Sequence, residues 1–371
     1  MSNSTISSVG KVSQAEAIGL VERLVKIQSP TSDLESLNQV TAEAQKIMTE
    51  LLGTSGEIKN LNGFPLLTWK SGQPKVLLLC HLDTVWPKDS FDPLWKVEGD
   101  QMHGPGVYDM KAGFVQALIA TASLSNKDGI YILATTDEEE GSFASRAFIE
   151  ESAKLCKHVL VFESAINGKL KISRKGTSMY RISVKGRASH AGLEPEKGIN
   201  AALELALLLP KIVSIADTKL GTTVTPTVFT SGTTLNTVPA LAQVDIDVRG
   251  FTKEEQERVD REINSLAGQL PSMAEVIVTG GINRPALDPK MSEDLFKVAQ
   301  RAALHLGLAP IEGASVGGAS DGNFTAAAGI PTLDGLGAVG DGAHAAHEWA
   351  SALALMERSA LVQVMLEELL K

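Results

Sequence analysis

The chain has 371 residues, of which 43% are hydrophobic and 21% charged, and its formal net charge is −10. This composition is typical of a globular protein, and the length favours two domains over one. The negative charge and the absence of a basic run argue against nucleic acid or an anionic membrane as a partner. Because there are two cysteines, no signal-peptide pattern and no apolar segment of about 18 residues, we expect a cytoplasmic protein.

The first part of the chain alternates helical and strand patterns. Some segments have apolar positions at helical spacing, and short uninterrupted apolar runs are typical of strands covered on both faces. The predicted helices are residues 14–27, 34–52 and 113–124, and the predicted strands are residues 76–80, 130–135 and 159–162. Strands that alternate with helices indicate an α/β sheet with crossover connections.

The middle of the chain has a different pattern. Residues 169–173 and 180–185 alternate polar and apolar side chains, as half-buried strands do. The elements predicted next are helix 199–209, strands 226–230 and 241–248, helix 253–267 and strand 274–279. This is the β-α-β-β-α-β order of a ferredoxin-like fold.

Helical patterns return after Arg284-Pro285, in residues 292–306, in residues 320–328 and in a C-terminal helix that extends to residue 370. The simplest layout is a discontinuous α/β domain with one insertion. We therefore expect an α/β/α domain formed by residues 1–174 and 285–371, and an inserted ferredoxin-like α+β domain formed by residues 175–284.

A histidine follows the first buried strand, in the segment Cys80-His81-Leu82-Asp83-Thr84. Ligands bind beyond the carboxyl ends of strands in open α/β sheets, so His81 is well placed for a site. Asp83 lies two residues further along extended chain and can reach the same imidazole, as a carboxylate that orients a metal-bound histidine does. A simple turn capped by Asp83 is the alternative.

A glycine-rich loop, Gly104-Pro105-Gly106-Val107-Tyr108-Asp109, leads into the predicted helix 113–124. It lacks the third glycine of a dinucleotide-binding motif and does not follow a buried strand, which argues against that function. Asp109 could instead bridge two cations with its two carboxylate oxygens.

Acidic residues follow the next two buried strands. The run Asp137-Glu138-Glu139-Glu140 comes after strand 130–135, and Glu163 comes directly after strand 159–162. A solvated loop and a surface exit are the alternatives. However, acids at successive strand ends can meet at one edge of the sheet, where one carboxylate could bind a metal while its neighbour acts as a base.

A second glycine-rich segment, Gly340-Asp341-Gly342-Ala343-His344, precedes the last helix. We favour His344 as a ligand over His347, which we expect at the start of that helix. Together the candidates are two histidines and three or four carboxylates, a set that suits two zinc ions and tolerates cobalt or manganese.

In the order and spacing of these motifs, the sequence resembles the zinc-dependent metallopeptidase family of glutamate carboxypeptidases, aminoacylases, acetylornithine deacetylases and succinyl-diaminopimelate desuccinylases. The resemblance covers nearly the whole chain. The motifs that carry it are HLDTV, GPGVYDMKAG, TTDEEEGS, VFES, GRASHAG, NTVP and GAHAAHEW.

The resemblance implies a role for each candidate. Asp109 would bridge two zinc ions, with His81 and Glu163 completing one site and Glu139 and His344 completing the other. Glu138 matches the general base, which would activate a water that bridges the metals, and Asp83 matches the carboxylate behind His81. The inserted domain would be a lid and dimerisation domain. Its His190 would reach the substrate across a homodimer and help to hold the developing oxyanion.

Within the family, the segments GSFASR, GRASHAG and NRPAL resemble the glutamate carboxypeptidase branch most. This resemblance narrows the range of expected substrates. Arg284 would grip a terminal carboxylate, assisted by Asn236 and Gly318, while Arg174 and Lys175 fit either substrate binding or the domain surface. We expect an enzyme that cleaves the amide bond of N-acyl amino acids or small peptides next to a C-terminal acidic residue. The alternative is an N-acyl amino acid deacylase that selects the acyl part.

Overall fold

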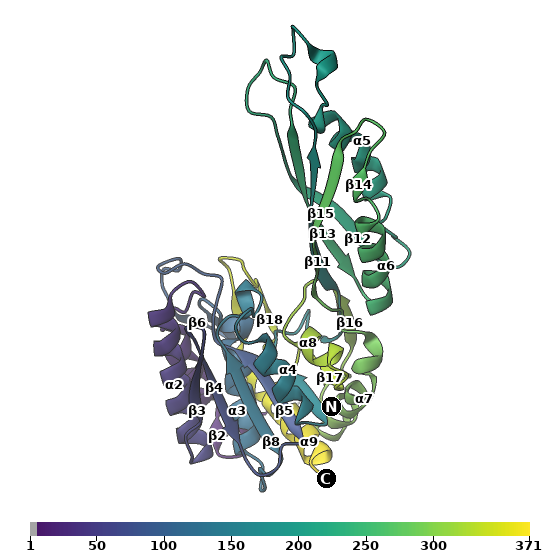
Figure 1. Cartoon of the computed structure of the whole chain (residues 1–371). Helices are drawn as coiled ribbons and strands as arrows, with labels where there is room; N and C mark the ends of the chain where they lie inside the picture. Colours follow the sequence, from purple (N-terminus) through teal and green to yellow (C-terminus); the bar gives the residue numbers. More distant parts are fainter. Residues whose placement is uncertain (1–5) are drawn as a thin grey trace. The chain divides into compact units, whose positions relative to one another are not determined.

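The computed structural model describes residues 6–371, which form two compact units (Figure 1). Unit 1 comprises the chain up to Ser173 together with Pro289–Val316 and Ser320–Lys371. Unit 2 comprises Arg174–Asp288 and the short segment Gly317–Ala319. The insertion predicted from the sequence spans residues 175–284, and residues 317–319 carry no sequence pattern that links them to it.

A six-stranded sheet forms the centre of unit 1, in the order β17-β9-β5-β8-β4-β3. The first four strands are parallel to one another, whereas β4 pairs antiparallel with β8 and β3 pairs antiparallel with β4. The strands are β3 Glu57–Leu61, β4 Phe64–Lys70, β5 Val76–His81, β8 Ile130–Thr135, β9 His158–Val161 and β17 Thr332–Leu333. The carboxyl ends of β5, β8 and β9 therefore lie at one edge, where His81 is in register with Thr135.

Helices cover both faces of this sheet, which confirms the predicted α/β/α architecture. In β5, Leu78 and Cys80 belong to one apolar core and Leu77 and Leu79 to another, because alternate side chains of a strand point to opposite faces. The first core includes side chains of α1 Gln14–Val25, α2 Leu34–Leu52, α3 Ala112–Ala122, α7 Glu293–His305 and α9 Ala352–Leu369. The second includes side chains of α4 Arg146–Lys154, and α8 Gly322–Ala327 packs beside α4.

Short strands and helical turns connect these elements. A four-stranded sheet in the order β18-β19-β7-β6 joins the C-terminal segment to the glycine-rich loop region. The remaining short elements outside unit 2 are β1 Ser8–Val9, β2 Val12–Ser13, β6 Lys96–Glu98, β7 Gln101–His103, η1 Val107–Lys111, η2 Glu138–Glu140, β10 Leu170–Arg174, η4 Pro289–Met291, β16 Gly313–Val316, β18 Gly340–Asp341 and β19 Trp349–Ser351. Within residues 6–371, no helix is both long and apolar enough to cross a bilayer.

Unit 2 has a five-stranded antiparallel sheet in the order β12-β13-β11-β15-β14 (Figure 1). Its elements are β11 Gly176–Lys185, η3 Pro195–Lys197, α5 Ala201–Val213, β12 Thr223–Ser231, β13 Leu241–Gly250, α6 Lys253–Asn264, β14 Gly268–Gln269 and β15 Glu275–Arg284. This is the predicted β-α-β-β-α-β order with β14 added. The predicted strand 169–173 lies in β10, which pairs with β16 and not with this sheet.

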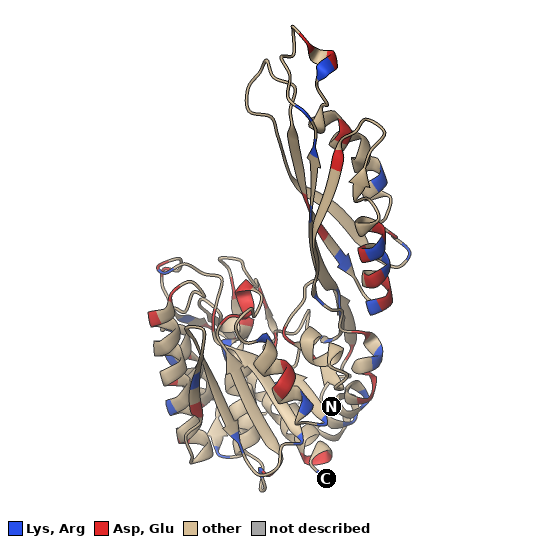
Figure 2. Cartoon of the chain, in the orientation of Figure 1, with Lys and Arg blue, Asp and Glu red and all other residues tan. Residues whose placement is uncertain are grey.

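The amphipathic pattern explains which face of the unit 2 sheet is covered. Tyr180, Ile182 and Val184 alternate along β11 and pack into a core with side chains of α5 and α6. Helix α6 buries Val259 and Ile263 and contains charged residues of both signs (Figure 2). Such a helix is stable only because its narrow apolar stripe is covered by the sheet.

Candidate metal centre

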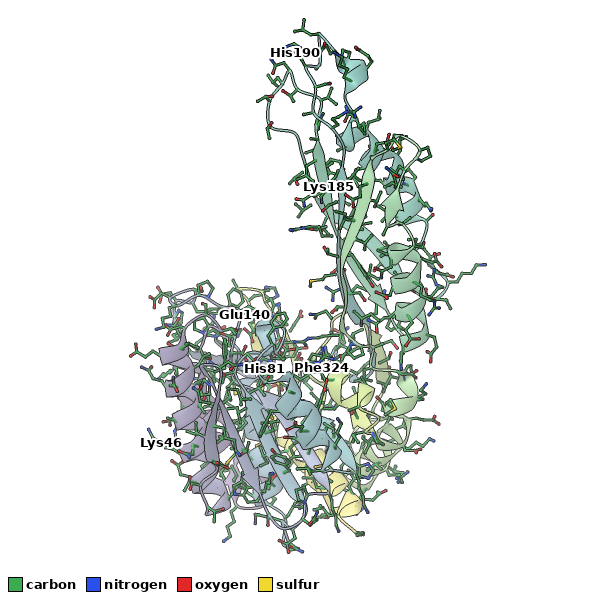
Figure 3. All side chains as sticks on the ribbon, in the orientation of Figure 1. Lys46, His81, Glu140, Lys185, His190 and Phe324 are labelled. Atoms are coloured by element: carbon green, nitrogen blue, oxygen red, sulfur yellow. The ribbon has the colours of Figure 1, made fainter. Side chains whose placement is uncertain are left out.

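His81 ends strand β5 at the carboxyl edge of the unit 1 sheet and is 2% exposed (Figure 3). Its Nδ1 lies 3.3 Å from Oδ1 of Asp83, and Asp83 itself is fully buried. This contact directs the other ring nitrogen, Nε2, away from Asp83. His81 thus presents Nε2 to the acidic residues described next.

Asp109 lies between the two histidines of the predicted ligand set. Its Oδ1 is 3.5 Å from Nε2 of His81, and its Oδ2 is 3.7 Å from Nε2 of His344. It sits in η1, where the backbone departs from helical geometry just before α3 begins at Ala112. The two oxygens of one carboxylate therefore face two different imidazoles, as in a ligand that bridges two cations.

Glu163 follows β9 and lies on the His81 side of Asp109. Its Oε1 is 3.6 Å from Nε2 of His81, and its Oε2 is 3.9 Å from Nζ of Lys171. The side chain is buried, so its charge requires nearby partners. Lys171 supplies one positive charge, and a cation between Glu163 and His81 would supply another.

The acidic run after β8 forms the short helical turn η2, and its members have different surroundings. Oε2 of Glu139 is 3.2 Å from Nε2 of His344, on the other side of Asp109. Glu138 is buried, and one of its oxygens lies within 4.8 Å of ligand atoms of His81 and Glu163. Glu140 is exposed. The run is therefore not the solvated loop that four consecutive acids would suggest.

These distances fit a pair of metal ions. Two ligands bound to one zinc ion at tetrahedral angles lie about 3.3 Å apart, close to the 3.2–3.7 Å found between the imidazole nitrogens and the carboxylate oxygens. Oδ1 of Asp109 is buried and accepts no hydrogen bond within the described residues. A buried carboxylate oxygen of this kind requires a positive partner, and a cation would satisfy it.

The pKa values of Glu139, His344 and His81 are also shifted by their proximity to one another and to the other acids. Burial raises the pKa of Glu139 to about 8, although His344 opposes this. Glu139 in turn raises the pKa of His344 to about 9. Burial lowers the pKa of His81, but Asp109, Asp83 and Glu163 outweigh it and hold that pKa well above its usual value. The acids therefore favour the positively charged form of both imidazoles, and a bound cation would supply positive charge in their place.

Three residues that were not predicted from the sequence form hydrogen bonds around this centre. Thr31 donates its hydroxyl to Oδ2 of Asp83 at 2.9 Å, and Ser142, at the end of the acidic loop, donates to the buried carboxylate of Asp321. The third is Glu348, which accepts hydrogen bonds from the Asp109 loop. Its place next to the two histidines of GAHAAHEW was the one available signal in the sequence.

The structure corrects the expected place of His347. Strand β19 follows it and pairs with β7, so α9 begins only at Ala352 and His347 lies in the preceding loop. His344 adopts a left-handed backbone conformation, with φ of 59°, in the same loop. His344 is the histidine that contacts Asp109 and Glu139.

Unit 2 carries the other predicted site residues, in two places. His190 lies on an exposed loop (Figure 3), and a backbone bridge to Thr237 places it beside the segment that contains Asn236. Arg284 ends β15 and is 5% exposed, and its carbonyl accepts a hydrogen bond from Gln256.

Gly318 lies within unit 2 and contacts a second buried arginine. Its carbonyl accepts a hydrogen bond from Nη1 of Arg174 at 3.2 Å, and the same nitrogen donates to the carbonyl of Ala319 at 3.3 Å. Arg174 is buried, so a position on the domain surface, one of the two alternatives expected for it, is wrong.

An α/β/α unit with acids and histidines gathered at its strand ends has the arrangement expected of a metal-dependent hydrolase. The model of Peptidase family M20/M25/M40 matches residues 77–368 of the chain. Carboxypeptidase G2 from Pseudomonas sp. (strain RS-16) is 32% identical over 364 residues, which span 89% of this chain and 83% of that protein. The chain belongs to this peptidase family and is a hydrolase.

A further relative agrees with this assignment, and two solved structures share the fold. Acetylornithine deacetylase from Buchnera aphidicola subsp. Schizaphis graminum is 31% identical over 218 residues, 53% of this chain and 55% of that protein. The structure of aminopeptidase PepT from Bacillus cereus matches with a TM-score of 0.78 at 22% identity, over 98% of this chain and 100% of that chain. The YXEP protein of Bacillus subtilis, described as a dinuclear metal-binding peptidase of family M20, matches with a TM-score of 0.67 at 15% identity, over 96% and 98%.

Proposed function

We propose that the protein is a two-zinc hydrolase of the glutamate carboxypeptidase type. It would cleave the amide bond of N-acyl amino acids or small peptides next to a C-terminal acidic residue. The observation that carries the proposal is the position of Asp109, whose two oxygens face His81 and His344 separately. In this assignment His81, Asp109 and Glu163 hold one ion, and Asp109, Glu139 and His344 hold the other; cobalt or manganese could replace zinc.

Glu138 is the proposed general base. Bound zinc ions would supply Lewis acidity, which polarises the scissile carbonyl and makes water a stronger acid. The carboxylate of Glu138 lies beside the group formed by His81 and Glu163, where it could take a proton from the attacking water. Glu138 would then deliver this proton to the nitrogen of the leaving amine.

The tautomer of His190 supports its proposed role as a hydrogen-bond donor. Its Nδ1 accepts hydrogen bonds from the backbone N–H groups of Gly192 and Leu193, both at 3.1 Å. In neutral imidazole the other nitrogen, Nε2, then carries the hydrogen. His190 would donate this hydrogen to the oxyanion that develops at the attacked carbonyl.

Recognition of an acidic substrate is assigned to Arg284, with Asn236 and Gly318 in supporting roles. The planar guanidinium of arginine binds carboxylates through two parallel hydrogen bonds. The similarity to carboxypeptidase G2 along most of that protein's length supports this branch of the family. A cytoplasmic location remains a prediction from the sequence.

A homodimer formed through unit 2 is also proposed. Leu203 and Leu207 of helix α5 are 57% and 67% exposed, and the edge strand β12 exposes Val228 and Phe229. Exposed apolar side chains beside an unpaired strand edge are typical of surfaces that a partner covers. Sedimentation of wild-type protein and of Leu207→Glu would test this assembly, and a monomeric wild type would contradict it.

The alternative function is an N-acyl amino acid deacylase that selects the acyl group. It is favoured by the similarity to acetylornithine deacetylase and to succinyl-diaminopimelate desuccinylase from Wolinella succinogenes, which is 25% identical over 310 residues. Both functions use the same metal centre, so substrate preference is what separates them.

The deciding experiment compares turnover of N-acyl-glutamate, N-acyl-aspartate and neutral N-acyl amino acids by the zinc-loaded protein. We expect the acidic substrates to be preferred, and Arg284→Ala to remove this preference chiefly by raising KM. Arg181→Ala is the matched control in unit 2, because Arg181 is exposed and pairs with Asp245. Equal turnover of neutral substrates that follows the acyl group would favour the deacylase.

A further inference from the structure

Glu348 is a buried acid beside the candidate metal centre, only 1% exposed. Its Oε1 accepts hydrogen bonds from the backbone N–H groups of Tyr108 at 2.9 Å and Asp109 at 3.1 Å. Its Oε2 accepts from the backbone N–H of Gly106 and from Nε1 of Trp86, both at 3.0 Å. Four donors from two separate segments of the chain thus converge on one carboxylate.

These four hydrogen bonds explain why Glu348 is not itself a metal ligand. A carboxylate has about four lone-pair directions, and here two donors occupy each oxygen. Hydrogen bonds to an ionised acceptor are roughly twice as strong as those between neutral groups, which offsets part of the cost of burying the charge, although burial still raises the pKa of Glu348. The carboxylate of Glu348 is therefore committed to the backbone of the loop that carries Asp109.

The same side chain links the two loops that meet at the centre. Glu348 lies four residues after His344, and its own backbone N–H donates to the carbonyl of Ala345 at 2.9 Å, which keeps this loop compact. Gly342 packs against the backbone of Glu348, where an added Cβ would lie 2.9 Å from Cα of Glu348. Glu348 thus joins the loop of His344 to the loop of Asp109.

We propose that Glu348 is a positioning residue for the metal centre. By fixing the backbone N–H of Asp109, it sets the direction of the carboxylate whose oxygens face His81 and His344. By bridging the two loops, it also fixes the distance between Asp109 and His344. The inference rests on the proposed function, because it requires that Asp109 and His344 bind metal.

The test is Glu348→Gln, examined with Co²⁺ as the probe. The amide keeps the size of the side chain but offers one acceptor oxygen, and its NH₂ group would oppose two of the four donors. Supporting residues of this kind typically contribute roughly 10–100-fold to metal affinity or activity. We expect Co²⁺ to bind more weakly by about that factor, the visible absorption spectrum of bound Co²⁺ to change, and kcat to fall with little change in KM.

Asp100→Asn is the matched control, because it also removes a carboxylate that accepts hydrogen bonds near the C-terminal segment. Asp100 accepts from the backbone of Leu353 at 2.7 Å and from Oγ of Ser351 at 2.5 Å, so its carboxylate is held by the start of α9 and not, among the described hydrogen bonds, by the Asp109 loop. It should lower Tm without changing the Co²⁺ spectrum. If Glu348→Gln binds two Co²⁺ ions with wild-type affinity and spectrum, the inference is wrong.

Two further variants keep the test open if Glu348→Gln does not fold. Glu348→Asp keeps the charge on a shorter side chain, and Trp86→Phe removes one of the four donors. A wild-type Co²⁺ affinity and spectrum in both variants would overturn the inference. Failure of the wild-type protein itself to bind two Co²⁺ ions would instead overturn the proposed function.

Discussion

The backbone N–H of Glu139 donates a hydrogen bond to Oδ2 of Asp83 at 3.1 Å. The other oxygen of Asp83 lies 3.3 Å from Nδ1 of His81. One buried carboxylate therefore contacts a proposed ligand of each metal ion. Asp83 orients the ring of His81 and fixes the backbone of the acidic loop relative to that ring.

Replacing Asp83 by asparagine should impair both halves of the centre. The amide removes the negative charge behind His81 and can retain only one of the two acceptor oxygens. We expect Zn²⁺ affinity or kcat to fall roughly 10–100-fold, measured by metal titration and by turnover. Asp128→Asn is the control, because Asp128 is exposed and accepts from Ser71. Wild-type metal affinity and turnover in Asp83→Asn would show that Asp83 only caps a turn.

Glu138→Gln should separate metal binding from turnover. The amide is nearly the same size but cannot take a proton from water, so kcat should fall by about 10²–10⁴ while two metal ions are retained. Metal content is measured by atomic absorption and kcat with the best substrate of the panel. The neighbouring variant Glu140→Gln, at an exposed position, should behave as wild type. If Glu138→Gln instead loses one metal ion, Glu138 is a ligand and not the base.

Gly113→Ala should destabilise unit 1 and disturb Glu163. A Cβ on Gly113 would lie 2.2 Å from the carbonyl oxygen of Phe162, the residue directly before Glu163. Overpacking of this kind costs about 1–3 kcal/mol, which exceeds the gain of at most about 1 kcal/mol that alanine brings to a helix. Urea unfolding measures the free energy of unfolding, and turnover reports the shift of Glu163.

Gly19→Ala is the control for this prediction. Gly19 is inside helix α1, and a Cβ there would meet no atom within 4 Å. The same substitution should therefore stabilise the protein by about 0.5–1 kcal/mol. Equal effects of the two substitutions would contradict the packing argument.

The ion pairs of Arg23 should make stability depend on pH. Arg23 joins α1 to Glu43 and Glu50 of α2, with nitrogen–oxygen distances of 2.7 Å to each. Burial of Glu43 raises its pKa, but the hydrogen bonds and charges of Arg23 and Lys46 together outweigh burial, and the pKa values of both Glu43 and Glu50 are lowered from 4.5. The stabilisation is therefore complete above pH 4.5 and is lost as the pH falls through the lower values of the folded protein.

Arg23→Gln tests this dependence by thermal unfolding at two pH values. At pH 7 the variant should be less stable than wild type by about 1 kcal/mol or less, because both partners are partly exposed. At about pH 3 the two proteins should differ less. A difference that grows as the pH falls would contradict the prediction.

Much of the centre could be predicted because parallel strands end at a common edge. His81, the acidic run after β8 and Glu163 each follow a buried apolar strand, and the structure brings them together at that edge. The strand patterns were clear because both faces of the sheet are covered, which leaves uninterrupted apolar runs.

The rest depends on contacts between distant loops, which local patterns do not encode. His347 was expected at a helix start because β19 is only three residues long and pairs with β7, far away in the sequence. Thr31 donates to the Asp83 carboxylate, and Glu348 accepts from backbone N–H groups. Neither contact has a sequence motif of its own. That Gly317–Ala319 belong to unit 2 could not be predicted from the sequence either, because a segment of three residues shows no periodic pattern.

Unit 1 is built from both ends of the chain, and this affects the order in which the protein can mature. During synthesis, the proposed ligands of the first part of the chain leave the ribosome before unit 2, whereas His344 and Glu348 follow it. Until His344 has been synthesised, a nascent chain therefore holds only part of the proposed ligand set. The proposed hydrolytic centre would be completed only when the segment that carries His344 packs against the rest of unit 1, so incomplete chains would be inert towards the amide bonds around them.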